Sequence, residues 1–271
     1  MATGQFELGV AGAGKMGAAL IRGLIAQGCL TAERIIAAEV HEPTRVRLTQ
    51  SCPGVTVVET VEQAAAAAGT LLIAVKPQDF EKALQPAVAV RLPEQLVISI
   101  MAGVPIRRLE ALLGEDTPIV RAMPNVACEV GQGAFGYCGN RHVNADRLAM
   151  VGRWFNAIGA AEQVKEELMD AVTGLSGSGP AFVALFIEAL ADGGVAAGLP
   201  RPVALRLAAQ TAMGAAKWVL EIGGPAALKD AVCSPAGTTI AGVRELESAA
   251  FRSAAVEAVV AAAEKAEELG S

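Results

Sequence analysis

Short apolar runs alternate with helix-periodic segments over residues 1–165 of the chain. This alternation is typical of βαβ units, in which a mostly parallel sheet carries helices on both faces. The connecting segments are short, as such units prefer. The pattern predicts strands at 6–11, 34–39, 55–58, 70–75, 96–100, 118–122, 133–138 and 161–164, and helices that include 16–27, 80–90 and 145–158.

Beyond residue 165 the strand signals stop and the rest of the chain follows helical periodicity. Between 182 and 190, apolar residues recur at i, i+3, i+4, i+7 and i+8, which places them on one helical stripe. Further helices are expected at 203–220, 238–247 and 249–269. A Gly-rich stretch at 173–180 is expected either to turn the chain tightly or to line a crevice between nucleotide and substrate. We therefore expect two domains, an α/β domain over 1–165 and an all-helical domain over 166–271.

The helical half is rich in Ala and Gly, so its helices can approach closely and leave apolar surface uncovered by their own chain. This composition predicts a homodimer formed largely by residues 166–271.

Composition narrows the function. The chain has 271 residues, is 53% hydrophobic and has a formal net charge of −6. This charge gives the surface no basic field, so we do not expect a nucleic-acid partner. The first residues do not resemble a signal peptide, and Gly174, Gly177, Gly179 and Pro180 interrupt the longest uncharged window, which is poor composition for a lone spanning helix. The five cysteines have no C-x-x-C spacing. We expect a cytoplasmic chain with no membrane span, no disulfide framework and no metal.

A glycine pattern follows the first predicted strand. Gly12, Gly14 and Gly17 form G-x-G-x-x-G between a strand and a helix, and Glu39 follows about 20 positions later, the context of a dinucleotide site in a Rossmann-type, doubly wound fold. Gly12 allows the tight turn, Gly14 lets the backbone approach the pyrophosphate, and Gly17 lets the helix pack on the strand. The pyrophosphate then meets free N–H groups at the helix start. The predicted contacts here are Gly12, Ala13, Gly14, Lys15, Met16 and Gly17.

Glu39 bears on the choice between cofactors. A carboxylate at the end of the second strand usually accepts hydrogen bonds from the adenosine ribose and would repel a 2′-phosphate, which favours NADH over NADPH. His41, Arg45 and Arg47 follow at once, however, and a guanidinium there can bind the phosphate if Glu39 points elsewhere. The sequence therefore leaves both cofactors open and leans to NADH.

An alcohol is a poor candidate for the substrate, because the oxidation of an alcohol usually relies on a histidine base. Neither His41, at the adenosine end, nor His142, in a polar turn, is well placed. Lys76 ends a strand and can face the nicotinamide, or merely fix the Pro77 turn. A protonated cyclic imine needs mainly orientation, with a carboxylate anchor and a hydroxyl near the ring nitrogen.

The segment 233–240 offers that anchor. Ser234, Thr238 and Thr239 lead into a predicted helix whose first N–H groups can bind an anion. The same hydroxyls can instead be simple N-caps.

These motifs together resemble the pyrroline-5-carboxylate reductase family. The resemblance covers most of the chain, and its most specific part is the Ser-Pro-x-Gly-x-Thr pattern beginning at Ser234. The other matching segments are 74–77, 99–104, 123–125, 175–182 and 189–195, and the signature pattern lies within a matching segment at 228–247. The resemblance implies reduction of Δ1-pyrroline-5-carboxylate to L-proline, the last step of proline biosynthesis, by an enzyme that uses NADPH or NADH.

The resemblance also implies roles for individual residues. Ser234, Gly237 and Thr238 would help hold the substrate carboxylate, Thr239 would hydrogen-bond the ring nitrogen as the catalytic residue, and Glu166 would face the substrate. The helical half would join two chains, and five such dimers form a decamer in the family. The further cofactor contacts implied are Ala74, Val75, Lys76, Pro77, Ile100, Met101 and Ala102.

Three departures from the family pattern accompany the match. Ala236 stands where Gly is common, Phe182 where Tyr is frequent, and Glu39 where NADPH-preferring relatives can carry a small hydroxyl residue. The competing hypotheses are a 3-hydroxyacid dehydrogenase or deazaflavin-dependent reductase on the same two-domain plan, and a dinucleotide-sensing protein without turnover.

Overall fold

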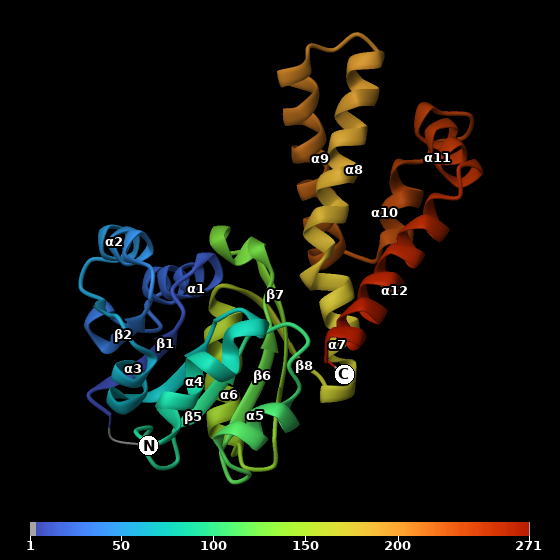
Figure 1. Ribbon diagram of the computed structural model, residues 1–271. Helices are drawn as coiled ribbons and strands as arrows, with labels where there is room; N and C mark the ends of the chain where they lie inside the picture. The colour runs from blue at the N-terminus through green and yellow to red at the C-terminus, as the bar shows by residue number, and fades with distance from the viewer. Residues whose placement is uncertain (1–3, 271) are drawn as a thin grey trace. The chain divides into compact units, whose positions relative to one another are not determined.

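The computed structural model describes residues 4–270 (Figure 1). The chain forms two compact units: the first comprises the chain up to Ser178 together with the stretch from Ala261 onward, and the second is Gly179–Val260. The first unit extends beyond the expected division at 165/166 because the residues after 165 are tied to its sheet, as described below. The division at 165/166 stays a prediction drawn from the pattern.

The first unit is built on one eight-stranded sheet with the order β3-β2-β1-β4-β5-β6-β7-β8. Strands β1 to β6 run parallel, β7 is antiparallel to β6, and β8 is parallel to β7. The order reverses between β1 and β4, which is the switch point where doubly wound sheets bind their ligands. The strands are β1 (Phe6–Ala11), β2 (Ile35–Ala38), β3 (Thr56–Val58), β4 (Ala68–Ile73), β5 (Leu96–Ser99), β6 (Ile119–Met123), β7 (Gly133–Gly139) and β8 (Gly159–Gln163). The predicted mostly parallel, doubly wound sheet is confirmed.

The register of the first five strands aligns their carboxyl ends. Ala11 of β1 pairs with Ala38 of β2 and with Ile73 of β4. Ala38 pairs in turn with Val58 of β3, and Ile73 pairs with Ser99 of β5. The turns that follow these five strands therefore lie along one edge of the sheet.

Helices cover both faces because the strands alternate their side chains between two cores. One face carries α1 (Lys15–Ala26), α2 (Glu42–Ser51) and α6 (Ala145–Ala157); the other carries α3 (Val61–Ala67), α4 (Phe80–Val88) and α5 (Ile106–Leu113).

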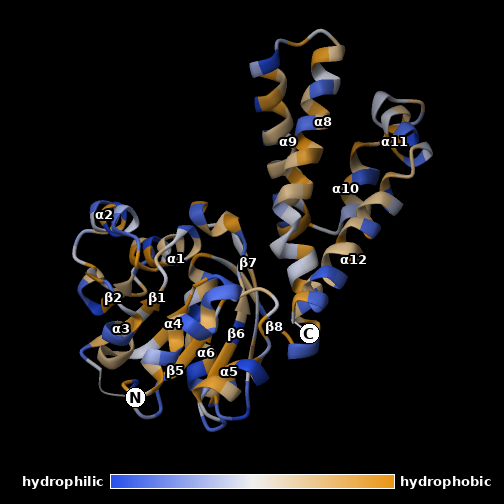
Figure 2. Cartoon of the chain, in the orientation of Figure 1, coloured by the Kyte–Doolittle hydropathy of each residue, from blue (hydrophilic) through white to orange (hydrophobic). Residues whose placement is uncertain are grey.

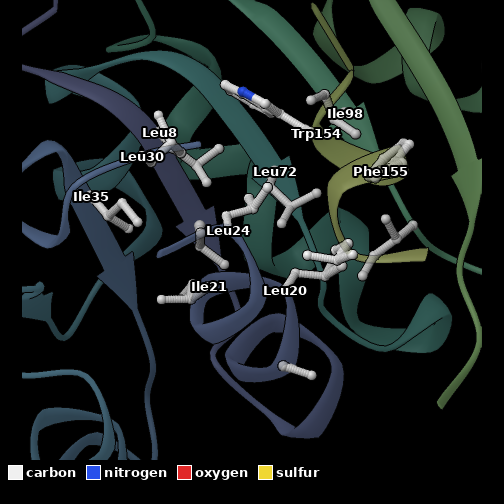
Figure 3. Packing of buried hydrophobic residues seen from close by; sticks show 14 of the residues in the cluster. Leu8, Leu20, Ile21, Leu24, Leu30, Ile35, Leu72, Ile98, Trp154 and Phe155 are labelled. Atoms are coloured by element: carbon white, nitrogen blue, oxygen red, sulfur yellow. The ribbon is translucent and has the colours of Figure 1, made fainter. Parts of the chain in front are cut away.

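In β4, Leu72 joins the first core and its neighbours Leu71 and Ile73 the second. Figure 3 shows Leu20 and Leu24 of α1 pointing toward the sheet, where they pack with Leu72. Each fully buried side chain of this size contributes about 1.5–3 kcal/mol.

The Gly-rich stretch 173–180 does not turn the chain, so that expectation is wrong. Helix α7 (Met169–Val172) runs through a π-helical segment, η5 (Thr173–Gly177), into α8 (Gly179–Ala196). The Thr173 hydroxyl donates to the Met169 carbonyl oxygen at 2.9 Å, and Ser176 does the same to Val172 at 3.0 Å. These bonds turn the hydroxyls back onto the helix, and the wider π turn accommodates them.

The second unit consists of helices. Figure 1 shows α8 and α9 (Arg201–Glu221) side by side as an antiparallel hairpin. Its small core contains Ala191, Ala204 and Ala208. A Cβ on Gly194 would lie 3.1 Å from the Ala204 Cβ, so the two helices approach closely. The remaining helices are α10 (Pro225–Val232), α11 (Thr238–Ser248) and α12 (Phe251–Gly270), of which α12 continues into the first unit.

Large apolar side chains stay exposed on these helices. Leu185 of α8 is 67% exposed, Met213 of α9 59% and Leu220 of α9 84%, and Figure 2 shows hydrophobic residues along both helices. Among residues 4–270, the helical run Glu166–Ala196 is long and apolar enough to cross a membrane by length and composition, and only 6% of its most apolar window is buried. Exposed apolar surface of this kind is typical of a site that contacts another molecule.

Candidate dinucleotide site

Two of the three motif glycines are required by the chain's own packing. Gly12 has φ +95°, and a Cβ there would lie 3.0 Å from the Ala74 carbonyl oxygen. A Cβ on Gly17 would overlap the Gly12 carbonyl oxygen, a backbone atom that cannot rotate away. Gly12 and Gly17 therefore set how closely α1 approaches β1 and the turn after β4.

Gly14 has no such requirement. Its φ of −63° and ψ of −168° are open to any residue, and no atom of the described residues beyond its immediate neighbours lies within 4 Å of a Cβ built on it. Gly14 is the N-cap of α1, and within residues 4–270 no side chain caps this helix. The first N–H groups of α1 are thus available to an anion, and a glycine at position 14 lets a ligand approach them closely.

The other predicted cofactor residues follow β4 and β5 on the same edge of the sheet. The Ala74 N–H donates to the Ala11 carbonyl oxygen at 2.8 Å, and the Ile100 N–H donates to that of Ile73 at 3.1 Å. Lys76 is exposed at the start of the short 3-10 turn Pro77–Asp79. Ala13, Ile100 and Met101 are buried, whereas Met16, Val75 and Ala102 are half-buried. The fold therefore brings all of the predicted cofactor residues to the carboxyl edge around the switch point.

The end of this edge that follows β2 and β3 is held by an ionic network. Glu39 is buried, and its Oε1 accepts the His41 N–H at 3.0 Å. Arg45 donates to the carbonyl oxygens of Glu39 and Val40, both at 3.0 Å, and to Glu59 Oε1 at 2.9 Å. Arg45 is therefore engaged by protein groups.

Arg47 lies differently from Arg45. Its Nη2 donates to Thr44 Oγ1 at 3.1 Å, and it lines an open depression of about 760 Å³ together with Gly14, Lys15 and Arg22. This depression carries three cationic side chains beside the glycine turn.

Glu166 belongs to a charged cluster in the first unit. Its Oε1 accepts the Ile106 N–H at 2.6 Å and lies 3.5 Å from Nη1 of the buried Arg121, whose Nη2 donates to Asp170 Oδ1 at 3.1 Å. The cluster ties the residues after 165 to β6 and to the start of α5. It also acts on a neighbour, because burial first and the Glu166 charge second raise the pKa of the Cys138 thiol to about 11.

The predicted substrate turn lies in the second unit. Gly237 is the N-cap of α11, and Thr238 and Thr239 are its first residues; all of the hydroxyls in this turn are exposed. The Gly237 N–H donates to the Ser234 carbonyl oxygen at 3.0 Å, and a Cβ on Gly237 would overlap Ser234 Oγ. The reading of these hydroxyls as simple N-caps is wrong, because the cap is Gly237 and no side chain of the described residues caps the helix.

Sequence reasoning missed Arg121, Asp170 and Glu59. A lone arginine within the apolar run of β6 is the one signal that pointed to Arg121, since a buried cation requires partners. The described residues contain no group of three or more His, Cys, Asp or Glu that could hold a metal ion.

A doubly wound sheet with an uncapped glycine turn at its switch point, followed by a helical unit, defines a dinucleotide-dependent oxidoreductase class of chain. Comparison with known proteins identifies the family within this class. Residues 166–269 match the family model described as "Pyrroline-5-carboxylate reductase dimerisation", and residues 7–103 match "NADP oxidoreductase coenzyme F420-dependent".

The chain is 47% identical to the pyrroline-5-carboxylate reductase of Methanosarcina acetivorans over 97% of this chain and 98% of that one. It is 47% identical to that of Synechocystis sp., covering 98% and 99%. The chain belongs to the pyrroline-5-carboxylate reductase family.

Solved structures agree with this assignment. The crystal structure of Plasmodium falciparum pyrroline carboxylate reductase with NADP bound matches with a TM-score of 0.86 and 34% identity, over 100% of both chains. The Coxiella burnetii pyrroline-5-carboxylate reductase matches with a TM-score of 0.92 and 32% identity, covering 98% and 99%. A 3-hydroxyisobutyrate dehydrogenase from Mycobacterium tuberculosis, at 16% identity and a TM-score of 0.52, shares the fold alone.

Proposed function

We propose that this protein reduces Δ1-pyrroline-5-carboxylate to L-proline with NADH or NADPH. The observation that carries the proposal is Gly14, a glycine that the chain's own packing does not require, at the switch point of a chain that matches pyrroline-5-carboxylate reductases along 97% of its length. When bound, the reduced nicotinamide supplies a hydride to the carbon of the protonated imine. The C=N electron pair passes to nitrogen, giving the secondary amine of proline and the oxidised cofactor.

The cofactor is held at the carboxyl edge of the sheet. The N–H groups at the start of α1 bind the pyrophosphate beside Gly14, because they lack a side-chain cap. The turns at 74–77 and 100–102 border the nicotinamide half, and Glu39 accepts hydrogen bonds from the adenosine ribose.

The substrate is held by the turn before α11. The N–H groups at the start of this helix and the hydroxyls of Ser234 and Thr238 bind the carboxylate, and the Gly237 backbone completes the anchor. Thr239 hydrogen-bonds the ring nitrogen and orients the imine, so it is the catalytic residue. Glu166 faces the substrate in this proposal, although its Oε1 is already shared by Ile106 and Arg121.

The direct test follows oxidation of NADH and of NADPH with pyrroline-5-carboxylate and identifies proline as the product. A rate equal to the blank with both cofactors would overturn the proposal. Turnover of a 3-hydroxyacid in its place would support the dehydrogenase alternative, and tight NADH binding without turnover of either substrate would support the sensor alternative.

Thr239→Ala separates the substrate turn from the cofactor edge. Loss of one hydrogen bond to a charged group is expected to lower kcat/KM by about tenfold to a hundredfold, with the Kd for NADH unchanged. The matched control is Thr49→Ala, an exposed threonine on α2 whose hydroxyl donates only to the Arg45 carbonyl oxygen, and it is expected to leave kcat/KM intact. Equal losses of turnover and of NADH binding in Thr239→Ala would contradict the role given to Thr239.

Two copies of the chain cover the apolar helices of the second unit in this proposal, and five such dimers assemble into a decamer in the cytoplasm. The dimerisation match over 166–269 and the exposed Leu185 and Leu220 support the dimer. Light scattering after size exclusion in detergent-free buffer should give a multiple of the dimer mass. Leu185→Lys should shift the mass toward the monomer, whereas Val130→Lys, at a 75% exposed valine of the first unit, should not. Recovery of the protein only with membranes or detergent would refute this arrangement.

A further inference from the structure

Two carboxylates end neighbouring strands at the adenosine end of the dinucleotide site. Ala38 of β2 pairs with Val58 of β3, and the Glu39 N–H donates to the Val58 carbonyl oxygen at 3.0 Å. Glu39 and Glu59 therefore directly follow adjacent strands. Glu39 is buried, whereas the Glu59 side chain is 73% exposed.

Arg45 is held between these two residues. Its Nη1 donates to the carbonyl oxygens of Glu39 and Val40, and its Nη2 donates to Glu59 Oε1 at 2.9 Å. The Arg45 side chain is only 20% exposed. Both terminal nitrogens thus serve protein acceptors, and within residues 4–270 the carboxylate that forms an ion pair with Arg45 is Glu59.

The charge balance of these three side chains disfavours a phosphate at the ribose 2′ position. Glu39, Glu59 and Arg45 together carry one net negative charge, and a phosphomonoester on the ribose brings about −1.5 to −2 more. A 2′-hydroxyl meets no such repulsion, and it can donate to Glu39, whose Oε1 is already oriented by the His41 N–H.

We infer that Glu59 is a positioning residue for cofactor choice: it withholds Arg45 from the ribose 2′ position and so makes the site prefer NADH to NADPH. Neutralising Glu59 removes one negative charge and replaces the carboxylate acceptor of Arg45 Nη2 with a weaker neutral one, so Arg45 can turn to the charge-assisted bonds that guanidinium groups make to phosphate. This inference rests on the proposed dinucleotide site but not on the imine substrate.

The experiment measures Kd by calorimetry for NADH and NADPH with the full-length protein, without substrate. The wild type is expected to bind NADH more tightly. Glu59→Gln is expected to tighten NADPH binding by about tenfold, the worth of one hydrogen bond to a charged group, with the Kd for NADH within about twofold. The gain should shrink in 0.5 M salt, since this end of the site is open to screening.

Two further variants separate release of Arg45 from a general change of charge. Glu42→Gln removes the same charge from an exposed residue of α2 that has no hydrogen bond or ion pair to Arg45 in the described structure, and it should change NADPH binding by less than about twofold. Glu59→Gln combined with Arg45→Gln should lose the gain for NADPH.

The inference is overturned if the wild type prefers NADPH, if Glu59→Gln leaves the ratio of the two Kd values unchanged, or if Glu42→Gln gives the same gain. Failure of the wild type to bind either dinucleotide would overturn the proposed function as well. A bound dinucleotide with an unchanged ratio in Glu59→Gln overturns the inference alone.

Discussion

Gly14 and Gly17 share one motif but meet different surroundings, and alanine at each position should therefore fail in a different way. At Gly17 the new methyl group would overlap the Gly12 carbonyl oxygen, so α1 or the turn must shift. Overpacking of this kind costs about 1–3 kcal/mol. For a chain of 271 residues that lowers Tm by roughly 2–5 °C.

At Gly14 the new methyl group meets no atom of the described residues within 4 Å, and the backbone is already in a conformation that alanine adopts. Exchanging glycine for alanine at an N-cap costs less than about 1 kcal/mol. The lower entropy of the unfolded chain offsets about 0.4–1 kcal/mol. We expect Tm within about 2 °C of the wild type and the Kd for NADH at least about tenfold weaker, equal to about 1.4 kcal/mol, because the methyl occupies the approach of the pyrophosphate.

Scanning fluorimetry and NADH titration of the two variants test this reasoning. Gly17→Ala should lower Tm, whereas Gly14→Ala should weaken NADH binding with little change in Tm. The reasoning is refuted if Gly14→Ala binds NADH as the wild type does, or if it unfolds as early as Gly17→Ala.

The remaining predictions concern stability and reactivity. Ala236 has φ +57°, which costs a residue with a Cβ about 1 kcal/mol, so Ala236→Gly should stabilise the protein by about 0.5 kcal/mol in urea unfolding; a loss of stability would contradict this. The raised pKa of Cys138, about 11 against 9.0, makes the folded thiol hold its proton more tightly, so the free energy of unfolding should fall as pH rises from 9 through 11. Alkylation of Cys138 at pH 9 should be about 50-fold slower in the folded protein than in urea. Arg121→Met leaves Glu166 and Asp170 without their cation and should cost about 2–3 kcal/mol, less than for fully buried partners because both carboxylates reach water; Arg121→Lys should recover part of the loss.

The sequence predicts the sheet well because its strands contrast with their surroundings. β1 is found at the predicted residues, and the other strands lie within one or two residues of their predicted bounds. Helices α2 and α3 are hard to recognise because their apolar pattern is weak: α2 buries only Leu48, and the apolar residues of α3 are mostly alanines. Glycines and hydroxyl residues at 173–180 also gave a turn signal where the chain stays helical.

The candidate site is less predictable than the fold, because its details depend on strand order. The glycine motif is local and can be read directly from the sequence. The pair of Arg45 with Glu59 becomes visible only when β3 lies beside β2, and that of Arg121 with Glu166 only when the residues after 165 return to β6. No spacing rule connects such residues along the chain.

Composition alone does not decide whether lipid or protein covers helix α8. The run Glu166–Ala196 passes the length and hydropathy test for a membrane span, yet the same surface suits a second copy of the chain. The acidic residues of α8 distinguish a lipid environment from contact with a second copy of the chain. Glu188 and Asp192 lie one turn apart in this helix, and Asp192 pairs with Arg201 of α9. A carboxylate at the centre of a bilayer costs about 2.5–3.5 kcal/mol, whereas the rim of a protein interface admits charged residues with little penalty. The acidic residues of α8 therefore add to the dimerisation match as support for the proposal that another copy covers this helix, because its mean hydropathy fits lipid and protein equally well.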